Sequence, residues 1–311
     1  MKILIVAAYN TNKFSPFVLE QAEALRKECN CEIDFFGIQG KGIKGYLSNL
    51  GKLNKKIREF QPDLIHAHYG LSGLLANLQR KVPVVTTYHG SDIHKGGFIL
   101  VLSKLAMYLS KYNIFVSQKI LYLSKYKNSN KIVISCGLDL DKIYSIERIK
   151  ARENLGLDLE KKYVLFSGSF SNKIKNVLLA KESIALLNGV ELLELKGYTR
   201  EEVNLLMNAC DAQLTTSFRE SGPLVVKEAM ACGTPVVSVD VGDVKEVFGR
   251  TEGCYIARYC PKDISEKLLK AFSFRGKTSG RERIEFLQLD NKIVVNKIMD
   301  VYNSVLKDNF I

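Results

Sequence analysis

No apolar stretch in this sequence approaches the ~20 consecutive residues that a membrane-spanning helix needs. The longest one, residues 98–109, is interrupted by Lys104. The N-terminal run 3–8 is too short for the core of a signal peptide, and an Asn-rich loop stands where a cleavage site would be needed. The sequence therefore predicts neither a membrane-spanning segment nor an export signal.

Disulfide and metal signatures are also lacking. The seven cysteines are an odd number without an export signal, so we expect reduced thiols and a cytoplasmic location. Cys29 and Cys31 form a C-x-C pair with no second pair, which does not predict a zinc site. With 46% apolar and 25% charged residues, the composition excludes disordered and collagen-like classes, and 311 residues suggest two domains.

Acidic residues are scarce in the first half of the chain. Residues 1–145 contain 20 Lys plus Arg and 10 Asp plus Glu, whereas residues 146–311 contain 25 and 23. A basic apolar segment attracts anionic lipid, so the first half predicts peripheral contact with a membrane surface; the alternative is a core-facing helix with solvated lysines. We expect no nucleic-acid partner, because arginines are few and no such module is recognisable. The lysines nearest the apolar segment are Lys95, Lys104, Lys111, Lys119, Lys125, Lys127 and Lys131.

Short apolar runs alternate with segments of helical spacing along the whole chain. This order predicts an α/β protein with two doubly wound, Rossmann-like parallel sheets. The charged stretch 141–159 predicts the boundary, which gives domains 1–145 and 146–291, and a last helix at about 292–311 is expected to pack back on the first domain. Predicted strands are 3–8, 32–36, 63–66, 83–88, 113–116, 131–134, 163–167, 190–195, 212–216 and 234–239; predicted helices include 46–60, 173–188, 199–209 and 223–232.

Open parallel sheets bind ligands beyond the carboxyl ends of their strands, and two such edges that face each other would form a cleft. The segment 217–237 follows one of these strand ends and places Glu220 in a loop and Glu228 in the second turn of a helix. The start of that helix can hold a diphosphate. Carboxylates on either side can accept hydrogen bonds from sugar hydroxyls. The alternative is that Glu220 and Glu228 are two solvated surface acids, which would have the same spacing in the sequence.

Glu220 and Glu228, with seven residues between them, are followed by Ala-Met-Ala-Cys-Gly-Thr-Pro-Val-Val at 229–237 and by the loop 240–246. This pattern resembles the signature of glycosyltransferase family 4, whose members are retaining enzymes of GT-B fold. Segments 62–68, 88–92 and 134–139 resemble further landmarks of that family in the same order. The resemblance covers nearly the whole chain. It implies a GT-B-like transferase of hexosyltransferase type that uses a nucleotide-sugar donor and requires no metal.

The resemblance also implies roles for individual residues. Glu220 and His89 would contact the donor sugar near its reacting carbon, and Glu228 would bind the ribose hydroxyls. Gly222 and Pro223 would bring backbone amides to the diphosphate. The family's arginine after the first strand of the second domain is replaced here by Ser169. Phosphate binding is then expected from Lys175, with Lys173 or Arg219 as substitutes, and Ser221 and Leu224 complete the donor-binding set.

The acceptor is expected on the basic first domain, as a glycan or a lipid-linked saccharide of cell-surface polysaccharide or lipopolysaccharide synthesis. The family's glycine-rich turn after the first strand is absent, so acceptor contacts cannot be transferred by resemblance. We assign Tyr9, Lys13, His68 and Asp92 to the acceptor side. His66 and His68 lie on one face of a strand, but no third metal ligand is evident.

Other motifs leave alternatives open. Residues 40–45 match the dinucleotide fingerprint Gly-x-Gly-x-x-Gly, but they follow the second strand rather than the first, which disfavours a dehydrogenase. Gly276-Lys277-Thr278 is similar to the end of a P-loop but lacks its first glycine and follows a helix. A nucleotide-sugar epimerase or hydrolase of the same fold, and a sugar-binding protein without catalysis, remain alternatives.

Overall fold

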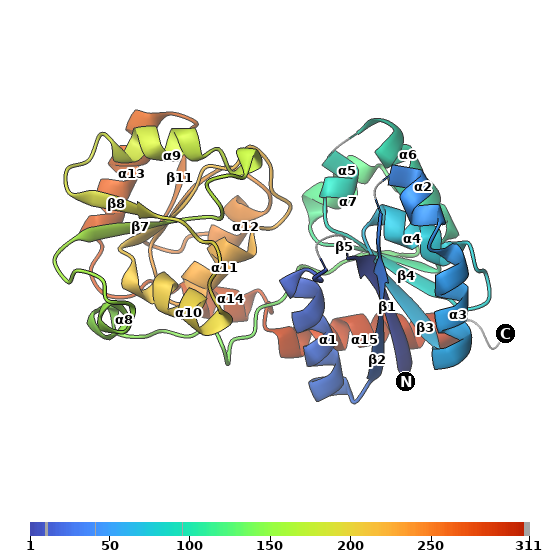
Figure 1. The fold of residues 1–311 in the computed structure, drawn as a ribbon. Helices are drawn as coiled ribbons and strands as arrows, with labels where there is room; N and C mark the ends of the chain where they lie inside the picture. The colour runs from blue at the N-terminus through green and yellow to red at the C-terminus, as the bar shows by residue number, and fades with distance from the viewer. Residues whose placement is uncertain (10–11, 41, 95, 308–311) are drawn as a thin grey trace. The chain divides into compact units, whose positions relative to one another are not determined.

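The computed structural model describes residues 1–9, 12–40, 42–94 and 96–307 (Figure 1). Lys41, Lys95, residues 10–11 of the first loop and residues 308–311 of the expected last helix therefore lie outside the described residues. The chain divides into two units, Met1–Gly137 with Asn291–Ile311, and Leu138–Asp290. The division falls at Gly137, earlier than the position 145 expected from the charged stretch.

The first unit is built on a six-stranded parallel sheet with strand order β2-β1-β3-β4-β5-β6. After β2, the chain crosses to the other side of β1 and forms β3 there, which makes the sheet doubly wound. The strands are β1 (Lys2–Ala8), β2 (Glu32–Ile38), β3 (Leu64–His68), β4 (Val84–Tyr88), β5 (Tyr112–Phe115) and β6 (Lys131–Val133).

Alternate side chains of β1 enter two separate cores on the two faces of this sheet. Ile3 and Ile5 pack with α1 (Pro16–Cys29) and α15 (Asn291–Lys307), whereas Leu4 and Val6 pack with α3 (Leu50–Phe60) and α4 (Gly70–Asn77). The alternation follows from the two-residue period of a strand that is covered on both faces. The remaining helices are α2 (Gly42–Leu47), α5 (Ser91–His94), α6 (Gly97–Leu109) and α7 (Gln118–Ser124).

The C-terminal helix α15 lies beside α1 in this unit (Figure 1). The Cys29 thiol donates to Asn296 Oδ1 at 3.8 Å, and the Cys31 thiol donates to Met299 Sδ at 3.6 Å. Burial raises the pKa of both thiols, which keeps them protonated at neutral pH. The C-x-C pair therefore anchors the last helix.

The second unit contains a five-stranded parallel sheet with strand order β11-β10-β9-β7-β8. Helices flank it and enclose one continuous apolar core. The strands are β7 (Lys162–Phe166), β8 (Val190–Leu193), β9 (Ala212–Thr215), β10 (Val236–Val239) and β11 (Cys254–Ala257); the helices are α8 (Arg148–Leu155), the 3-10 turn η1 (Lys173–Lys175), α9 (Val177–Ile184), α10 (Arg200–Ala209), α11 (Leu224–Ala231), α12 (Val244–Phe248), α13 (Pro261–Ser273) and α14 (Gly280–Phe286).

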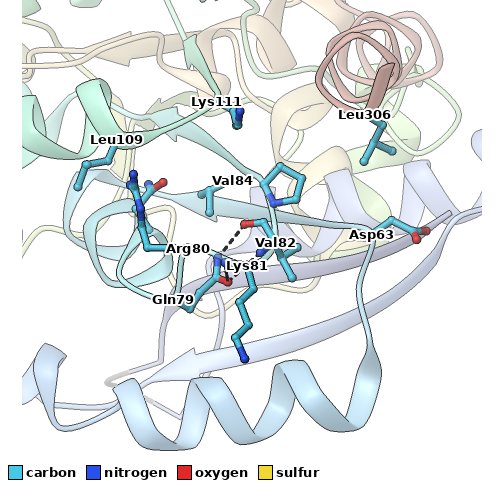
Figure 2. A pocket seen from close by; sticks show the side chains of 11 residues that line it. Asp63, Gln79, Arg80, Lys81, Val82, Val84, Leu109, Lys111 and Leu306 are labelled. Carbon is cyan, nitrogen blue, oxygen red and sulfur yellow. Dashed lines mark hydrogen bonds between the residues drawn. The ribbon is translucent and has the colours of Figure 1, made fainter. Parts of the chain in front are cut away.

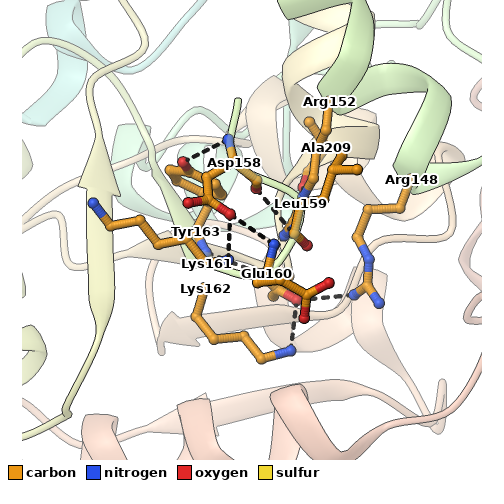
Figure 3. A network of polar contacts seen from close by, with 10 residues as sticks. Arg148, Arg152, Asp158, Leu159, Glu160, Lys161, Lys162, Tyr163 and Ala209 are labelled. Carbon is orange, nitrogen blue, oxygen red and sulfur yellow. Dashed lines mark hydrogen bonds and ion pairs between the residues drawn. The ribbon is translucent and has the colours of Figure 1, made fainter. Parts of the chain in front are cut away.

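Several details differ from the expectations, and the helix expected at 46–60 is divided into α2 and α3. Strand β11 was not predicted, and the helix expected at 173–188 is divided by Asn176, whose φ of 53° ends η1 before α9 begins. The stretch 141–159 is no simple linker, since it contains α8. Figure 3 shows Arg148 and Arg152 of this helix reaching toward the start of β7, where both pair with the buried Asp211.

None of the described helices combines the length and the apolar character needed to cross a membrane. None of the seven cysteines, all of which are described, forms a disulfide bond.

Candidate functional site

The strand order of the second unit identifies where a ligand would bind. Strand β7 pairs with β8 on one side and β9 on the other, so the chain leaves β7 and β9 in opposite directions at their carboxyl ends. Such a switch point leaves a crevice outside the sheet. The loops that border this crevice begin at Ser167, after β7, and at Thr216, after β9.

Lys175 and Glu220 meet at this switch point. Lys175 Nζ donates to Glu220 Oε1 at 2.7 Å, and the two side chains are 20% and 16% exposed. Gly168, with φ of +153°, leaves room for the lysine, because a Cβ atom there would lie 3.2 Å from Lys175 Cε. The Thr216 hydroxyl also donates to the carbonyl oxygen of Lys175, at 3.0 Å, and so joins the two loops. The structure thus places the ammonium and the carboxylate of two predicted site residues in direct contact.

The start of α11 lies in the same loop. Pro223 is the N-cap and the helix begins at Leu224, one position later than expected. Proline has no backbone N–H, so the amides available to a diphosphate come from Gly222 and from the first turn of the helix rather than from Pro223. Gly222 packs closely, since a Cβ atom there would lie 2.8 Å from Asp243 Oδ2 and 3.2 Å from Lys227 Nζ.

Glu228 is held by a residue that the sequence analysis missed. Arg200 Nη1 donates to Glu228 Oε1 at 2.7 Å, and the Glu228 side chain is almost fully buried. Arg200 is the first residue of α10, which is fixed by a capping box between Thr199 and Glu202. This capping pattern at the end of a strand is visible in the sequence and could have directed attention to Arg200.

Ser169 stands beside another residue that was missed. Its hydroxyl donates to Glu194 Oε1 at 2.9 Å, and the Phe170 N–H donates to the same oxygen at 2.7 Å. These hydrogen bonds lower the pKa of Glu194, and the one from the Phe170 N–H has the larger effect. A carboxylate therefore lies beside the position at which the family has an arginine, while Lys173 and Arg219 are both exposed.

Two of the predicted residues of the first unit gather at the ends of β3 and β4. The rings of His68 and His89 are joined by a hydrogen bond of 3.0 Å between His68 Nδ1 and His89 Nε2. His66 lies behind them, 2.5 Å from the Tyr302 hydroxyl and 2.7 Å from the Thr87 hydroxyl. Burial lowers the pKa of all three imidazoles, that of His68 to about 3, so they are neutral at pH 7.

Asp92 fixes the two loops that carry these rings. Its carboxylate accepts the Gly70 N–H at 3.0 Å and the Gly90 N–H at 2.8 Å. Burial raises the pKa of this carboxyl to about 6, although the backbone hydrogen bonds act in the opposite direction. Asp92 and His68 are both buried and hold the loop that carries His89. Their assignment to the acceptor side stays a prediction.

Comparison with known proteins identifies the family. Residues 17–142 match the family model described as Glycosyltransferase Family 4, and residues 190–283 match the model described as Glycosyl transferases group 1. The chain belongs to glycosyltransferase family 4. This assignment confirms the resemblance on which the site residues were chosen.

Individual relatives agree with this family. An uncharacterised glycosyltransferase of Methanocaldococcus jannaschii is 29% identical over 91% of this chain and 84% of its own length. A putative teichuronic acid biosynthesis glycosyltransferase of Bacillus subtilis is 26% identical over 69% of this chain and 62% of its own length. The crystal structure of Anabaena HepE with UDP and glucose matches with a TM-score of 0.74 and 18% identity, over 98% of this chain and 100% of that chain. The two doubly wound sheets are therefore those of the GT-B fold.

The structure also places the other predicted residues and motifs of this family 4 glycosyltransferase. Tyr9 is anchored to β2 by its N–H, which donates to the Ile38 carbonyl at 2.8 Å, and Lys13 is exposed. Residues 40–45, which match the dinucleotide fingerprint, follow the edge strand β2 and run into α2, away from the switch point between β1 and β3. Lys277 donates to Asn208 and to the Cys232 carbonyl, which is not a P-loop arrangement.

Two large cavities also lie away from the predicted site. One of about 630 Å³ includes Gln79, Arg80, Lys81 and Lys111 at the amino ends of the strands of the first sheet (Figure 2). Another of about 520 Å³ lies at the amino ends of β7, β9 and β10. Among residues 1–9, 12–40, 42–94 and 96–307, no three His, Cys, Asp or Glu side chains are grouped to hold a metal ion.

Proposed function

We propose that this glycosyltransferase moves a sugar from a nucleotide-diphosphate donor to a hydroxyl group of a glycan or lipid-linked saccharide, with retention of the anomeric configuration. The observation that carries the proposal is the pair of cation–carboxylate contacts, Lys175–Glu220 and Arg200–Glu228, on either side of the start of α11. A nucleotide sugar has a diphosphate between two rings that carry hydroxyl groups. The cations could bind the diphosphate, and the two carboxylates could accept hydrogen bonds from the hydroxyl groups on either side of it. The similar HepE structure holds UDP and glucose, which supports a UDP-sugar as the first donor to test.

In this proposal, donor binding exchanges partners at the Lys175–Glu220 pair. The ammonium of Lys175 turns to the diphosphate, and the carboxylate of Glu220 accepts a hydrogen bond from a sugar hydroxyl. The bond between the anomeric carbon and the phosphate oxygen breaks, and the acceptor oxygen bonds to the same face of that carbon. The acceptor proton passes to the departing phosphate oxygen, whose charge Lys175 and the first turn of α11 stabilise without a metal ion.

Nucleotide binding is the first property to test. Thermal unfolding would be followed with UDP, GDP, ADP and NAD, since a ligand at about 100 times its Kd adds about 2.7 kcal/mol to the native state. We expect one nucleoside diphosphate to raise the melting temperature, and Glu228→Ala to abolish that rise. Glu201→Ala, which removes an exposed acid from the first turn of α10, is the matched control. Stabilisation by NAD alone would overturn the proposal and favour a dinucleotide site at residues 40–45.

The Ser169–Glu194 contact favours one second candidate, a nucleotide-sugar-binding protein without catalysis. The Glu194 carboxylate lies beside Ser169, where the family has an arginine, so this cation is not available to stabilise the leaving group. Turnover separates the two functions, because a binding protein is stabilised by the donor but does not consume it.

The first unit carries an exposed apolar stripe that suits a membrane-bound acceptor. Phe98, Val101, Leu105 and Tyr108 of α6 are 61%, 59%, 47% and 65% exposed. Their spacing of three, four and three residues places them on one face of the helix. Nearby α7 adds Tyr122, which is 83% exposed. We propose that this stripe enters an anionic lipid surface, because lysines without a single acid accompany it along residues 93–138.

Vesicle sedimentation tests this surface. We expect the protein to bind vesicles that contain phosphatidylserine or phosphatidylglycerol, to bind phosphatidylcholine vesicles poorly, and to dissociate as salt is raised. Phe98→Ser should weaken binding about tenfold, since burying one such side chain contributes about 1.5–3 kcal/mol. Phe286→Ser, which replaces a phenylalanine of the second unit that is 75% exposed, is the control. Equal losses in both variants, or equal binding to neutral vesicles, would contradict the proposal.

A further inference from the structure

Three histidine rings of the first unit form a stacked column. The His66 and His68 ring centroids are 4.5 Å apart with an interplanar angle of 23°, and those of His68 and His89 are 5.2 Å apart with an angle of 24°. His66 and His68 are fully buried, whereas His89 is partly exposed. Only His89 of the three can therefore reach a ligand without rearrangement of the protein.

The hydrogen bond between His68 Nδ1 and His89 Nε2 requires a proton on one of these two atoms. Burial keeps each ring neutral, so each carries a single N–H. The other nitrogen of His68, Nε2, is buried and has no hydrogen-bond partner among the described residues. A proton on His89 Nε2 would force the His68 proton onto this partnerless atom. A buried N–H without an acceptor is rarer in proteins than an unused lone pair, which favours a proton on His68 Nδ1.

The consequence for His89 follows from its neutral charge. If Nε2 accepts the proton of His68, the single proton of His89 lies on Nδ1. The ring cannot turn easily to exchange these atoms, because Phe17 and Tyr69 flank it with centroids 4.5 Å and 4.8 Å away. Cys136 Sγ lies 4.0 Å from His89 Nδ1. Sulfur at this distance is a weak acceptor, so an oxygen at an ordinary hydrogen-bond distance would be preferred.

We propose that His68 is a positioning residue that holds His89 in its Nδ1–H tautomer, so that His89 donates a hydrogen bond to an oxygen atom of the transferred sugar. The choice of a sugar oxygen rests on the proposed function, whereas the tautomer rests on the His68–His89 contact alone. In this role His89 is a donor and not a general base, since its accepting nitrogen is already occupied by His68.

Nitrogen-15 NMR of histidine-labelled protein measures the tautomer without any substrate. The chain has four histidines, so the ring signals can be assigned by single substitutions. We expect His89 Nδ1 to be protonated and Nε2 to be unprotonated in the unaltered protein. His68→Asn should retain this state, because its amide N–H can replace Nδ1–H, whereas His68→Ala should release His89 to the Nε2–H form that predominates in free imidazole side chains.

Activity provides the second measurement. His68→Ala should lower kcat/KM for the donor by about threefold to tenfold, the effect of one hydrogen bond, and His68→Asn should restore it. His66→Asn is the matched control, since it alters the column but leaves the His68–His89 contact. A protonated Nε2 on His89 in the unaltered protein, or an unchanged tautomer in His68→Ala, would overturn the positioning role. The expected tautomer without turnover of any nucleotide sugar would instead overturn the proposed function and the sugar oxygen with it.

Discussion

Replacing Lys175 with alanine is expected to lower kcat for sugar transfer by about 10²–10³-fold, the cost of removing one group that faces transition-state charge. Lys175 projects from the loop at the β7–β9 switch point, where it contacts Glu220 at 2.7 Å. With Ser169 in place of an arginine, and with Lys173 and Arg219 exposed, Lys175 is the predicted phosphate ligand that an ion pair holds in place. Its removal also leaves the largely buried Glu220 carboxylate without the ammonium group that pairs with it.

Steady-state kinetics with the nucleotide sugar chosen by thermal shift would measure this effect. Lys161→Ala is the matched control, because it also removes one lysine from an ion pair, with Glu191, but at the opposite end of the sheet. The control should keep kcat within about twofold, as expected for an exposed pair of small energetic value. A kcat that falls less than about threefold in Lys175→Ala would exclude Lys175 from stabilising the leaving group.

Much of the fold could be predicted because both sheets are parallel and covered on both faces. Their strands are short, mainly apolar or β-branched runs that are fully buried in the structure, and helical segments separate them, so β3, β4 and β9 are evident in the sequence. Strand β11 escaped because it pairs on one side only, with β10, and most of its side chains are partly buried. The equally short edge strand β8 was predicted, so an edge position makes a strand harder to recognise but does not by itself hide it.

Local backbone geometry explains the other differences in secondary structure. The spacing of apolar residues predicted one helix from 173 to 188, but Asn176 adopts a left-handed conformation that asparagine tolerates. This break gives Lys175 its own short turn, from which it reaches Glu220. Periodicity reports which residues are buried, and it carries no information about a single residue that ends one turn and starts another.

The site was predicted to the extent that its residues follow each other closely in sequence. Glu220, Gly222 and Glu228 lie within one loop and helix, so their motif could be recognised as a unit. Tyr302 could not be found in this way, because it contacts His66 across 236 residues. Contacts of this kind arise only when the last helix has docked on the first sheet.

Replacing Asp211 with alanine is expected to destabilise the second unit by about 3–5 kcal/mol, the range for breaking one side of a buried ion pair. The Asp211 side chain is 1% exposed and accepts hydrogen bonds from Arg148 at 2.9 Å, Arg152 at 2.8 Å and Lys162 at 3.1 Å (Figure 3). It also accepts the Tyr163 N–H at 2.9 Å. Alanine would leave the buried Arg152 guanidinium without its counter-ion and the Tyr163 N–H without its acceptor.

Urea unfolding of Asp211→Ala and Glu191→Ala would measure this difference. Glu191 pairs with Lys161 near the same end of the sheet, but both side chains are more than 40% exposed, so its loss should cost at most about 1 kcal/mol. The contrast arises from solvation: water replaces the missing carboxylate around Lys161, whereas the packing around Arg152 excludes it. Equal destabilisation by both variants would show that water reaches Arg152, and that the network joining α8 to β7 contributes no more than a surface ion pair.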